Sequence, residues 1–277
     1  MSDRMRISLI AIIVCILGCS EAPLETSDIK LFGHGGAGFD NVNSVYAPNS
    51  VPSISSALDD YHLDGVEVDV QFTADSLLIV YHDGFLEGST QCKGKISDIN
   101  LADVVGCKYR KQFSNRYEDG IISFDSLVVL INNKWPNKYF SLNLKLNTSN
   151  LQEMRAYARV YYREIQKIND RDRIRTECSD ANFLLALKRI NKKEIVLLIH
   201  NLDSIGYKNV FRFGLDGIVS PFDEIRVNLA KSLLSESKYV ISYNQQFARD
   251  YKTEDFRYIT SVQVDNPILA IKYFRNK

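Results

Sequence analysis

The sequence lacks the features that mark several large functional classes. It has four histidines and one tryptophan, and 34 basic residues balance 34 acidic ones, so its formal net charge is zero. No run of like charge stands out, and we therefore expect no nucleic-acid partner. Neither a Cys-x-x-Cys or Cys/His cluster with zinc spacing nor the glycine pattern of a nucleotide-binding loop is present. These absences argue against a zinc protein and against a nucleotide-binding enzyme.

Long apolar runs are also scarce, and the N-terminal one, Ile7 to Leu17, has a special context. It follows two arginines and is too short to span a bilayer as a helix, which predicts a signal peptide over residues 1–18. A small residue and Cys19 come next, and this arrangement resembles a bacterial lipobox. We expect a lipid on Cys19, residues 19–28 as a tether, and a lipoprotein of the bacterial cell envelope, on the periplasmic or cell-surface side. An ordinary signal peptide and an uncleaved anchor stay open.

Three further cysteines follow Cys19. In an oxidising compartment Cys92 and Cys107 can pair across a loop of fifteen residues. Free buried thiols at Cys92, Cys107 and Cys178 are the alternative.

Residues 29–277 alternate short apolar strands with helical segments and form one expected domain. This alternation is typical of a parallel sheet, and the length suits an α/β barrel. Counting one hairpin as a single position leaves eight strands, which favours a closed TIM (β/α)8 barrel. The expected strands are 29–32, 66–71, 77–81, 139–146, 173–178, 194–200, 217–220, 239–242 and 259–264. The expected helices are 52–61, 101–108, 124–132, 151–167, 182–190 and 224–235.

The stretch from Asp64 to Asp83 carries the densest chemistry. Valines alternate with Glu67 and Asp69, so both carboxylates point to one face of a strand, where they can share Mg²⁺ or Ca²⁺. A short turn then leads to a second strand that ends in His82 and Asp83. Because such a turn cannot make a parallel crossover, we expect an antiparallel hairpin that brings His82 beside Asp69.

Two other segments are candidates for the same site. The first strand ends in a glycine-rich turn, His34 to Gly38, where the backbone can approach a ligand closely, and we expect Gly35 to contact the substrate there. A later alternating strand places Asn143 and Lys145 on one face. Since an unpaired buried lysine is costly, we expect Lys145 to point at an anion.

Together these motifs resemble the glycerophosphodiester phosphodiesterase family, a family of TIM barrels. Its characteristic HRG, PENT, ExD, TxD, HD, ExK and TDNP motifs read here as HGG, PNSV, EVD, TAD, HD, NLK and VDNP. The resemblance covers nearly the whole chain after the signal peptide. It implies that His34 and His82 form an acid/base pair, that Glu67 and Asp69 bind a metal with Asn143 at the third ligand position, and that Lys145 meets the phosphate.

Three departures from the family pattern affect the expected site. Gly35 replaces an arginine that would bind the substrate phosphate, Asn49 replaces a glutamate, and Asn143 replaces a metal-binding glutamate. An amide oxygen can coordinate Ca²⁺ or Mg²⁺ but brings no charge, so we expect a weakly bound divalent cation.

The predicted function is hydrolysis of glycerophosphodiesters or related lipid headgroups, assisted by a metal and by two histidines. The expected partners are a small phosphodiester substrate and a membrane, reached through the lipid anchor. A non-catalytic ligand-binding lipoprotein on a degenerate barrel and a phospholipase C-like lyase remain alternatives.

Overall fold

The computed structural model describes residues 24–39, 46–110, 119–245 and 254–275. The predicted signal peptide and Cys19 lie outside these residues. Among the helices that are described, none is both long and apolar enough to cross a membrane.

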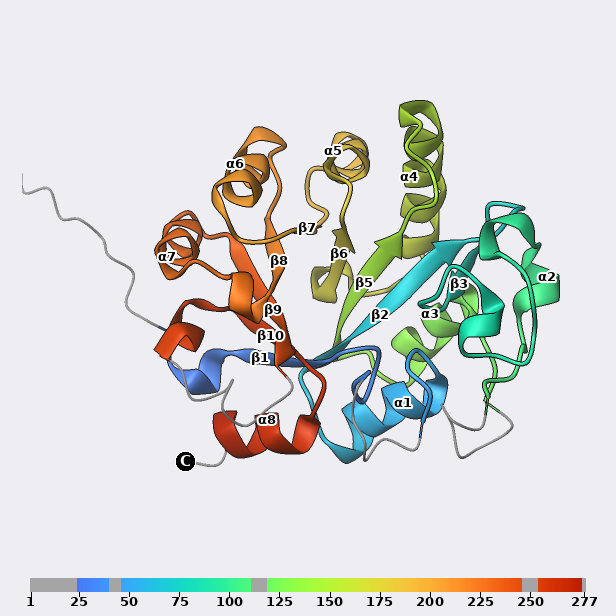
Figure 1. The fold of residues 1–277 in the computed structure, drawn as a ribbon, viewed down its shortest axis with the longest axis horizontal. Helices are drawn as coiled ribbons and strands as arrows, with labels where there is room; N and C mark the ends of the chain where they lie inside the picture. The colour runs from blue at the N-terminus through green and yellow to red at the C-terminus, as the bar shows by residue number, and fades with distance from the viewer. Residues whose placement is uncertain (1–23, 40–45, 111–118, 246–253, 276–277) are drawn as a thin grey trace, which may run out of the picture.

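Eight parallel strands close into a barrel, which confirms the predicted TIM fold (Figure 1). The ring closes where the first strand pairs with the second, at Phe32 with Gly65 and at Gly33 with Val66. The barrel strands are β1 (Lys30–Gly33), β2 (Gly65–Phe72), β5 (Tyr139–Lys145), β6 (Ile174–Cys178), β7 (Val196–Ile199), β8 (Gly217–Pro221), β9 (Tyr239–Gln245) and β10 (Ser261–Val264).

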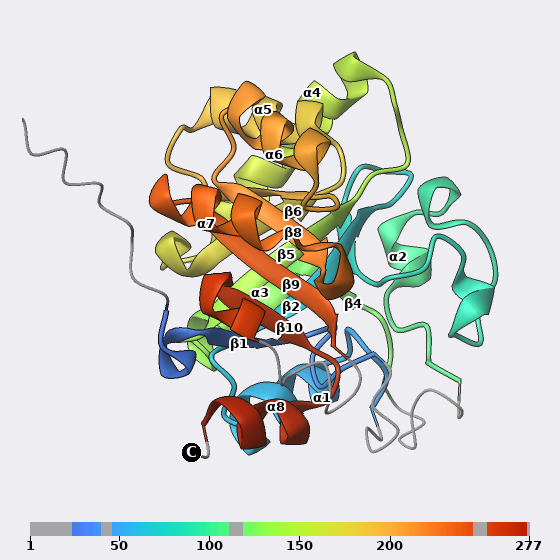
Figure 2. The same ribbon diagram turned by 60° about the vertical axis from the view of Figure 1, so that its left-hand side comes forward.

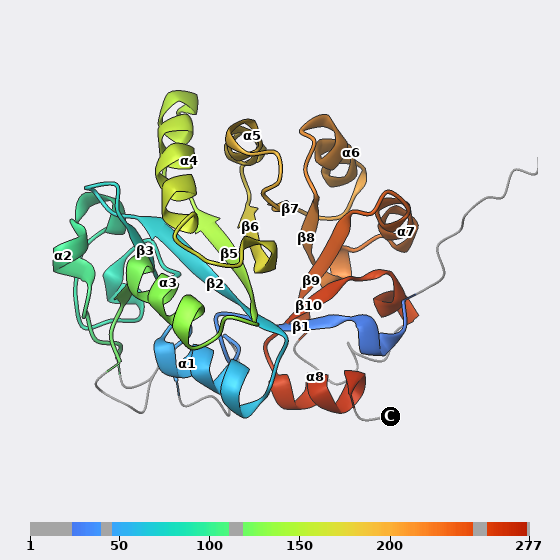
Figure 3. The same cartoon turned by 180° about the vertical axis from the view of Figure 1, so that it is seen from behind.

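Helices cover the outside of the barrel (Figures 1 and 3). Several begin at an Asn or Asp whose side chain accepts hydrogen bonds from the first turn, as at Asn150, Asp180, Asp203 and Asn266. Two helices, α6 (Ser204–Arg212) and α8 (Pro267–Phe274), were not expected from the sequence. The other helices around the barrel are α1 (Val51–Ser55), continued by a π-helical turn (Ser56–Asp60), α3 (Phe124–Asn133), α4 (Leu151–Ile165), α5 (Ala181–Ile190) and α7 (Val227–Ser235).

The strand alternation sorts apolar from polar side chains. Val66, Val68 and Val70 belong to the large apolar cluster shared with the helices. Glu67 and Asp69 therefore face the barrel interior, because neighbouring residues of a strand point to opposite faces. Both carboxylates are buried.

An insertion, defined here as residues 84–121, leaves the barrel after the predicted hairpin of β2 and β3 (Leu78–Val80). Figure 2 places its helix α2 (Leu101–Val104) to one side of the barrel. A short strand, β4 (Ile122–Ser123), pairs antiparallel with β3 and was not expected. A disulfide joins Cys92 and Cys107, with Cα atoms 5.9 Å apart.

The predicted helix 101–108 is wrong beyond Val104. Val105 is extended and Gly106 adopts φ +85°, a conformation outside the helical region, so the chain turns away. Cys107 then joins a small apolar core of the insertion together with Leu86, Ile96 and Tyr109.

Candidate active site

Polar side chains from neighbouring strands converge at the carboxyl-terminal mouth of the barrel. Strand register aligns Asp69 with Asn143, and Asn143 with Glu177. All three are buried. Sequence reasoning missed Glu177, although a carboxylate on an otherwise buried parallel strand is an available signal. Its oxygens accept hydrogen bonds from Ser141 Oγ and from Gln263 Nε2.

The glycine-rich turn places His34 at the end of β1. Its Nδ1 lies 2.9 Å from Asp265 Oδ1, in the VDNP segment after β10. Burial would lower the pKa of His34, but the hydrogen bond and charge of Asp265, with the charges of Glu67 and Asp69, raise this pKa to about 9. His34 is thus a cation at neutral pH when no metal ion is near.

Glu67 connects the glycine-rich turn to the barrel interior. Its Oε2 accepts a hydrogen bond from the Gly35 backbone N–H at 3.0 Å, while its Oε1 is buried without a hydrogen-bond partner. Burial, followed by the charge of Asp69, raises the pKa of Glu67 to about 8. The Gly35 amide, a predicted substrate contact, therefore faces a carboxylate in this structure.

The absence of a side chain at Gly35 leaves room for the ring of Phe39. The residue has φ +58°, and a Cβ there would lie 2.5 Å from the ring of Phe39. This ring lies between the two predicted catalytic histidines, with centroids 4.6 Å from His34 and 5.0 Å from His82. Sequence reasoning missed Phe39, because nothing in the local pattern predicts this contact.

Asp69 has partners on both carboxylate oxygens. Lys145 Nζ lies 3.0 Å from its Oδ1, and Asn49 Nδ2 donates to its Oδ2 at 2.8 Å. Burial lowers the pKa of Lys145, but Asp69 and Glu67 raise it overall. Lys145 thus remains a cation at the mouth, paired here with a carboxylate.

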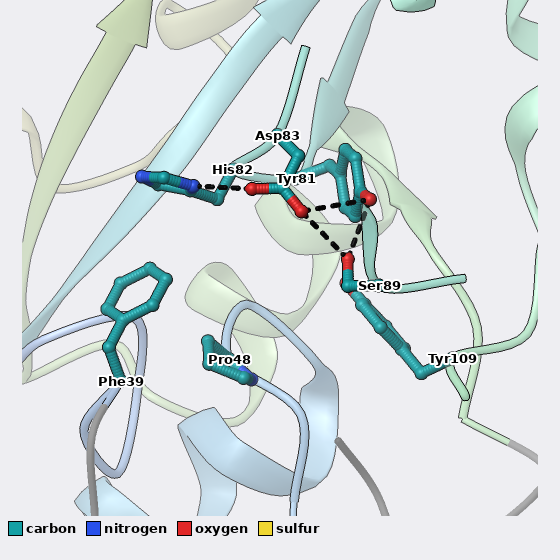
Figure 4. A pocket seen from close by; sticks show the side chains of 7 residues that line it. All are labelled: Phe39, Pro48, Tyr81, His82, Asp83, Ser89 and Tyr109. Atoms are coloured by element: carbon teal, nitrogen blue, oxygen red, sulfur yellow. Dashed lines mark hydrogen bonds and ion pairs between the residues drawn. The ribbon is translucent and has the colours of Figure 1, made fainter. Parts of the chain in front are cut away.

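The predicted antiparallel hairpin forms, and it brings Tyr81, the residue before His82, beside Asp69. The backbone N–H of Tyr81 donates to the Asp69 carbonyl at 3.0 Å, and His82 follows at the rim. The His82 Nδ1 lies 2.9 Å from Asp83 Oδ1 (Figure 4). The His82 side chain is 48% exposed and that of His34 is 19% exposed, so His82 is the outer member of the pair.

Arg175 fills the barrel interior near Ser141, its register neighbour on β5. Its guanidinium lies about 5 Å from the ring centroids of Phe32, Tyr139 and Tyr239. Burial lowers the pKa of Arg175. The barrel interior thus holds a guanidinium group in addition to Lys145, and sequence reasoning did not identify it.

The polar mouth has oxygen atoms that could bind a cation, but it does not form a complete metal-binding site. Within the described ranges, no group of three or more His, Cys, Asp and Glu side chains could hold a metal ion. Two of the buried oxygens that have no hydrogen-bond partner nevertheless belong to this group of strand residues, Glu67 Oε1 and Asn143 Oδ1. Unsatisfied buried oxygens of this kind fit a hard divalent cation, with water completing its coordination.

Solved structures share this architecture. A phosphodiesterase from Oleispira antarctica, determined in complex with the product sn-glycerol-3-phosphate, has a TM-score of 0.77 and 14% identity, covering 90% of this chain and 97% of its own. A glycerophosphodiester phosphodiesterase from Parabacteroides distasonis has a TM-score of 0.76 and 16% identity, covering 89% and 97%. A glycerophosphodiester phosphodiesterase from Thermotoga maritima has a TM-score of 0.67 and 18% identity, and the match covers 88% of this chain and 97% of its own.

Sequence comparison gives the family directly. No curated protein sequence matches the chain. The family profile described as the glycerophosphoryl diester phosphodiesterase family matches residues 37–257, most of the barrel and the whole insertion. The chain therefore belongs to the glycerophosphoryl diester phosphodiesterase family and is an enzyme that hydrolyses glycerophosphodiesters.

Proposed function

We propose that His34 and His82 are the acid/base pair of this hydrolysis. One observation carries the proposal: each imidazole Nδ1 is hydrogen-bonded to a carboxylate, Asp265 for His34 and Asp83 for His82. Such a bond fixes the ring and leaves Nε2 to exchange a proton with a ligand.

The two histidines, on opposite sides of the mouth, have different roles in the reaction. His34 lies on the inner side, beside the buried carboxylates, and in its neutral form takes a proton from the attacking water as the new P–O bond forms. His82 lies on the outer side and gives its proton to the oxygen of the leaving alcohol as the P–O bond breaks. Lys145 offers positive charge to the phosphate oxygens once its contact with Asp69 loosens. The net reaction adds water and yields a glycerol phosphate and a free alcohol.

A divalent cation, Ca²⁺ or Mg²⁺, belongs to this proposal as a weakly held group. Glu67 and Asn143 would hold it through their unpaired oxygens, with Asp69 beside them. When bound, it supplies positive charge that stabilises the phosphate oxygens in the transition state.

The proposed location at the membrane rests on the lipobox-like sequence alone. We place the enzyme in the bacterial cell envelope, anchored through a lipid on Cys19, so that its substrates are lipid headgroup diesters released near that membrane.

The test is alcohol release from a panel of glycerophosphodiesters, with Ca²⁺, Mg²⁺ or a chelator. His34→Ala and His82→Ala should each lower kcat about 100-fold or more while circular dichroism stays unchanged. His62→Asn is the matched control, because His62 is exposed and has φ +53°, which asparagine tolerates. Full turnover in both alanine variants would refute the pair, and ligand binding without turnover would indicate a binding protein.

A further inference from the structure

A hollow of about 300 Å³ adjoins the outer histidine (Figure 4). Its wall comes from the glycine-rich turn, the segment before α1, the end of β3 and the insertion. The lining residues are Phe39, Pro48, Tyr81, His82, Asp83, Ser89 and Tyr109.

The lining has an unusual chemical character. Three of its residues are aromatic besides His82, and its one acidic side chain is Asp83. No lysine or arginine is among these residues. Asp83 is held in place, because its Oδ1 contacts His82 and its Oδ2 accepts from Ser89 Oγ at 3.1 Å and Tyr81 Oη at 3.4 Å. Aromatic rings beside a fixed carboxylate favour a cation with an apolar surface.

Tyr109 adds an independent sign that the hollow takes a ligand. Its hydroxyl is buried and has no hydrogen-bond partner. A buried polar group without a partner is costly in a folded protein, and a bound molecule or water is the usual explanation. Burial also raises the pKa of Tyr109 well above its usual range, so the hydroxyl stays neutral.

The position of the hollow assigns it to one end of the substrate. The inner side of the mouth, around His34, is lined by Glu67, Asp69 and Asn143, which suit the hydroxyl groups of glycerol. The hollow lies on the other side of Phe39, against His82. If His82 protonates the leaving oxygen, the alcohol bound to that oxygen extends into the hollow.

We propose that this hollow is the leaving-group subsite and that it selects an alcohol bearing a quaternary ammonium group, such as choline. The proposal rests on the proposed function for the role of His82. Phe39 and Tyr109 are its specificity-determining residues: they supply aromatic surface to the ammonium methyl groups, and Asp83 supplies the opposite charge.

The experiment compares two substrates of the same shape. One is glycerophosphocholine, and the other carries 3,3-dimethylbutanol, in which a neutral carbon replaces the ammonium nitrogen. We expect kcat/KM of the full chain to be about tenfold higher for the choline ester, the size of a cation–aromatic contribution. Equal values for the two esters would overturn the proposal.

The variants identify the residues responsible. In Phe39→Leu and Tyr109→Leu the ratio of the two kcat/KM values should fall toward one, whereas Tyr109→Phe, which keeps the ring, should retain it. Phe211→Leu is a control outside the hollow, because Phe211 lies on α6 and is 41% exposed. If Tyr109→Leu does not fold, Phe39→Leu alone tests the proposal, because Phe39 is only partly buried. A ratio unchanged in Phe39→Leu would refute the role of Phe39.

A binding measurement separates this proposal from the proposed function. Calorimetry with choline and with 3,3-dimethylbutanol needs no turnover. Tighter binding of choline in a chain that hydrolyses neither ester would keep the subsite and reject the catalytic roles. Choline that binds no tighter than the neutral alcohol would reject the subsite, whatever the activity.

Discussion

Asn49 and Asp69 are joined by two reciprocal hydrogen bonds. Asn49 Nδ2 donates to Asp69 Oδ2, and the Asp69 backbone N–H donates to Asn49 Oδ1, both at 2.8 Å. The asparagine stands where the family motif has glutamate, and it adopts φ +64°. One amide thus stabilises the buried carboxylate of Asp69 from one side, while Lys145 contacts its other oxygen.

Asn49→Asp should convert this stabilising pair into two facing carboxylates. In chelator we expect a loss of about 2 kcal/mol or more in the free energy of unfolding, because a buried charge loses its donor and gains a like charge. Added Ca²⁺ should restore part of that loss. The measurement is urea unfolding with and without the ion.

Asn244→Asp is the matched control for this change. Asn244 also has a left-handed backbone, φ +68°, but is exposed. It should change stability by no more than about 0.5 kcal/mol, with no calcium response. Equal costs at the two positions would show that the backbone conformation, and not the contact with Asp69, matters.

The titration of His34 should depend on metal. In chelator, NMR of the imidazole should give a pKa of about 9, above the model-peptide value of about 6.5. Saturating Ca²⁺ should lower it, since a cation opposes the carboxylates that stabilise the imidazolium. A value near 6.5 in chelator would contradict the influence of Asp265.

The same shift predicts how stability depends on pH. Because the folded-state pKa is raised, the contribution of His34 is fully present below about pH 6.5 and is lost as pH rises toward about 9. Unfolding in chelator at pH 6 and at pH 9.5 should show this loss in the parent, and a smaller loss in His34→Gln. An identical loss in both proteins would assign the effect to other groups.

Asn143→Glu should tighten cation binding about tenfold, because a third carboxylate adds charge to the donors at Glu67 and Asp69. In chelator the same variant should be less stable than the parent. Calorimetry with Ca²⁺ and Mg²⁺ measures the affinity. Asn228→Glu, on the exposed face of α7, controls for added surface charge. Absence of cation binding in both parent and variant would leave Glu67 and Asp69 in a metal-free site.

The disulfide of the insertion should contribute measurable stability. It closes a loop of fifteen residues, for which chain entropy gives about 3 kcal/mol. Cys92→Ala combined with Cys107→Ala should lower the free energy of unfolding by that order and abolish the effect of a reducing agent. Cys178→Ala, which removes a buried free thiol, should keep that effect. Reductant sensitivity that persists in the double variant would contradict the assignment.

Lipid anchoring is tested by Cys19→Ala. The unchanged protein should partition with membranes and carry the mass of a lipid, and the variant should do neither. Identical fractionation and intact mass would refute the lipobox interpretation.

The sequence predicts local periodicity well and distant contacts poorly. The strands around Glu67 and Asp69 and the hairpin that carries His82 follow from alternation and from a short turn. Phe39 between the histidines, and Asp265 against His34, depend on segments far apart in the chain, so no local pattern indicates them. The helix predicted at 101–108 fails for a related reason, since Cys107 is drawn into the core of the insertion.

The first strand of the barrel lies between the second and the last, and this has a consequence for folding order. β1 pairs with β10 over four residues and with β2 over two, and His34 meets Asp265 across 231 positions of sequence. A chain emerging during synthesis can form the hairpin of His82 early, but the His34 imidazole lacks its partner Asp265 until the last strand arrives. Contacts so distant in sequence form slowly. The inner half of the barrel mouth, around His34, is therefore completed last, and refolding experiments should recover most secondary structure before activity.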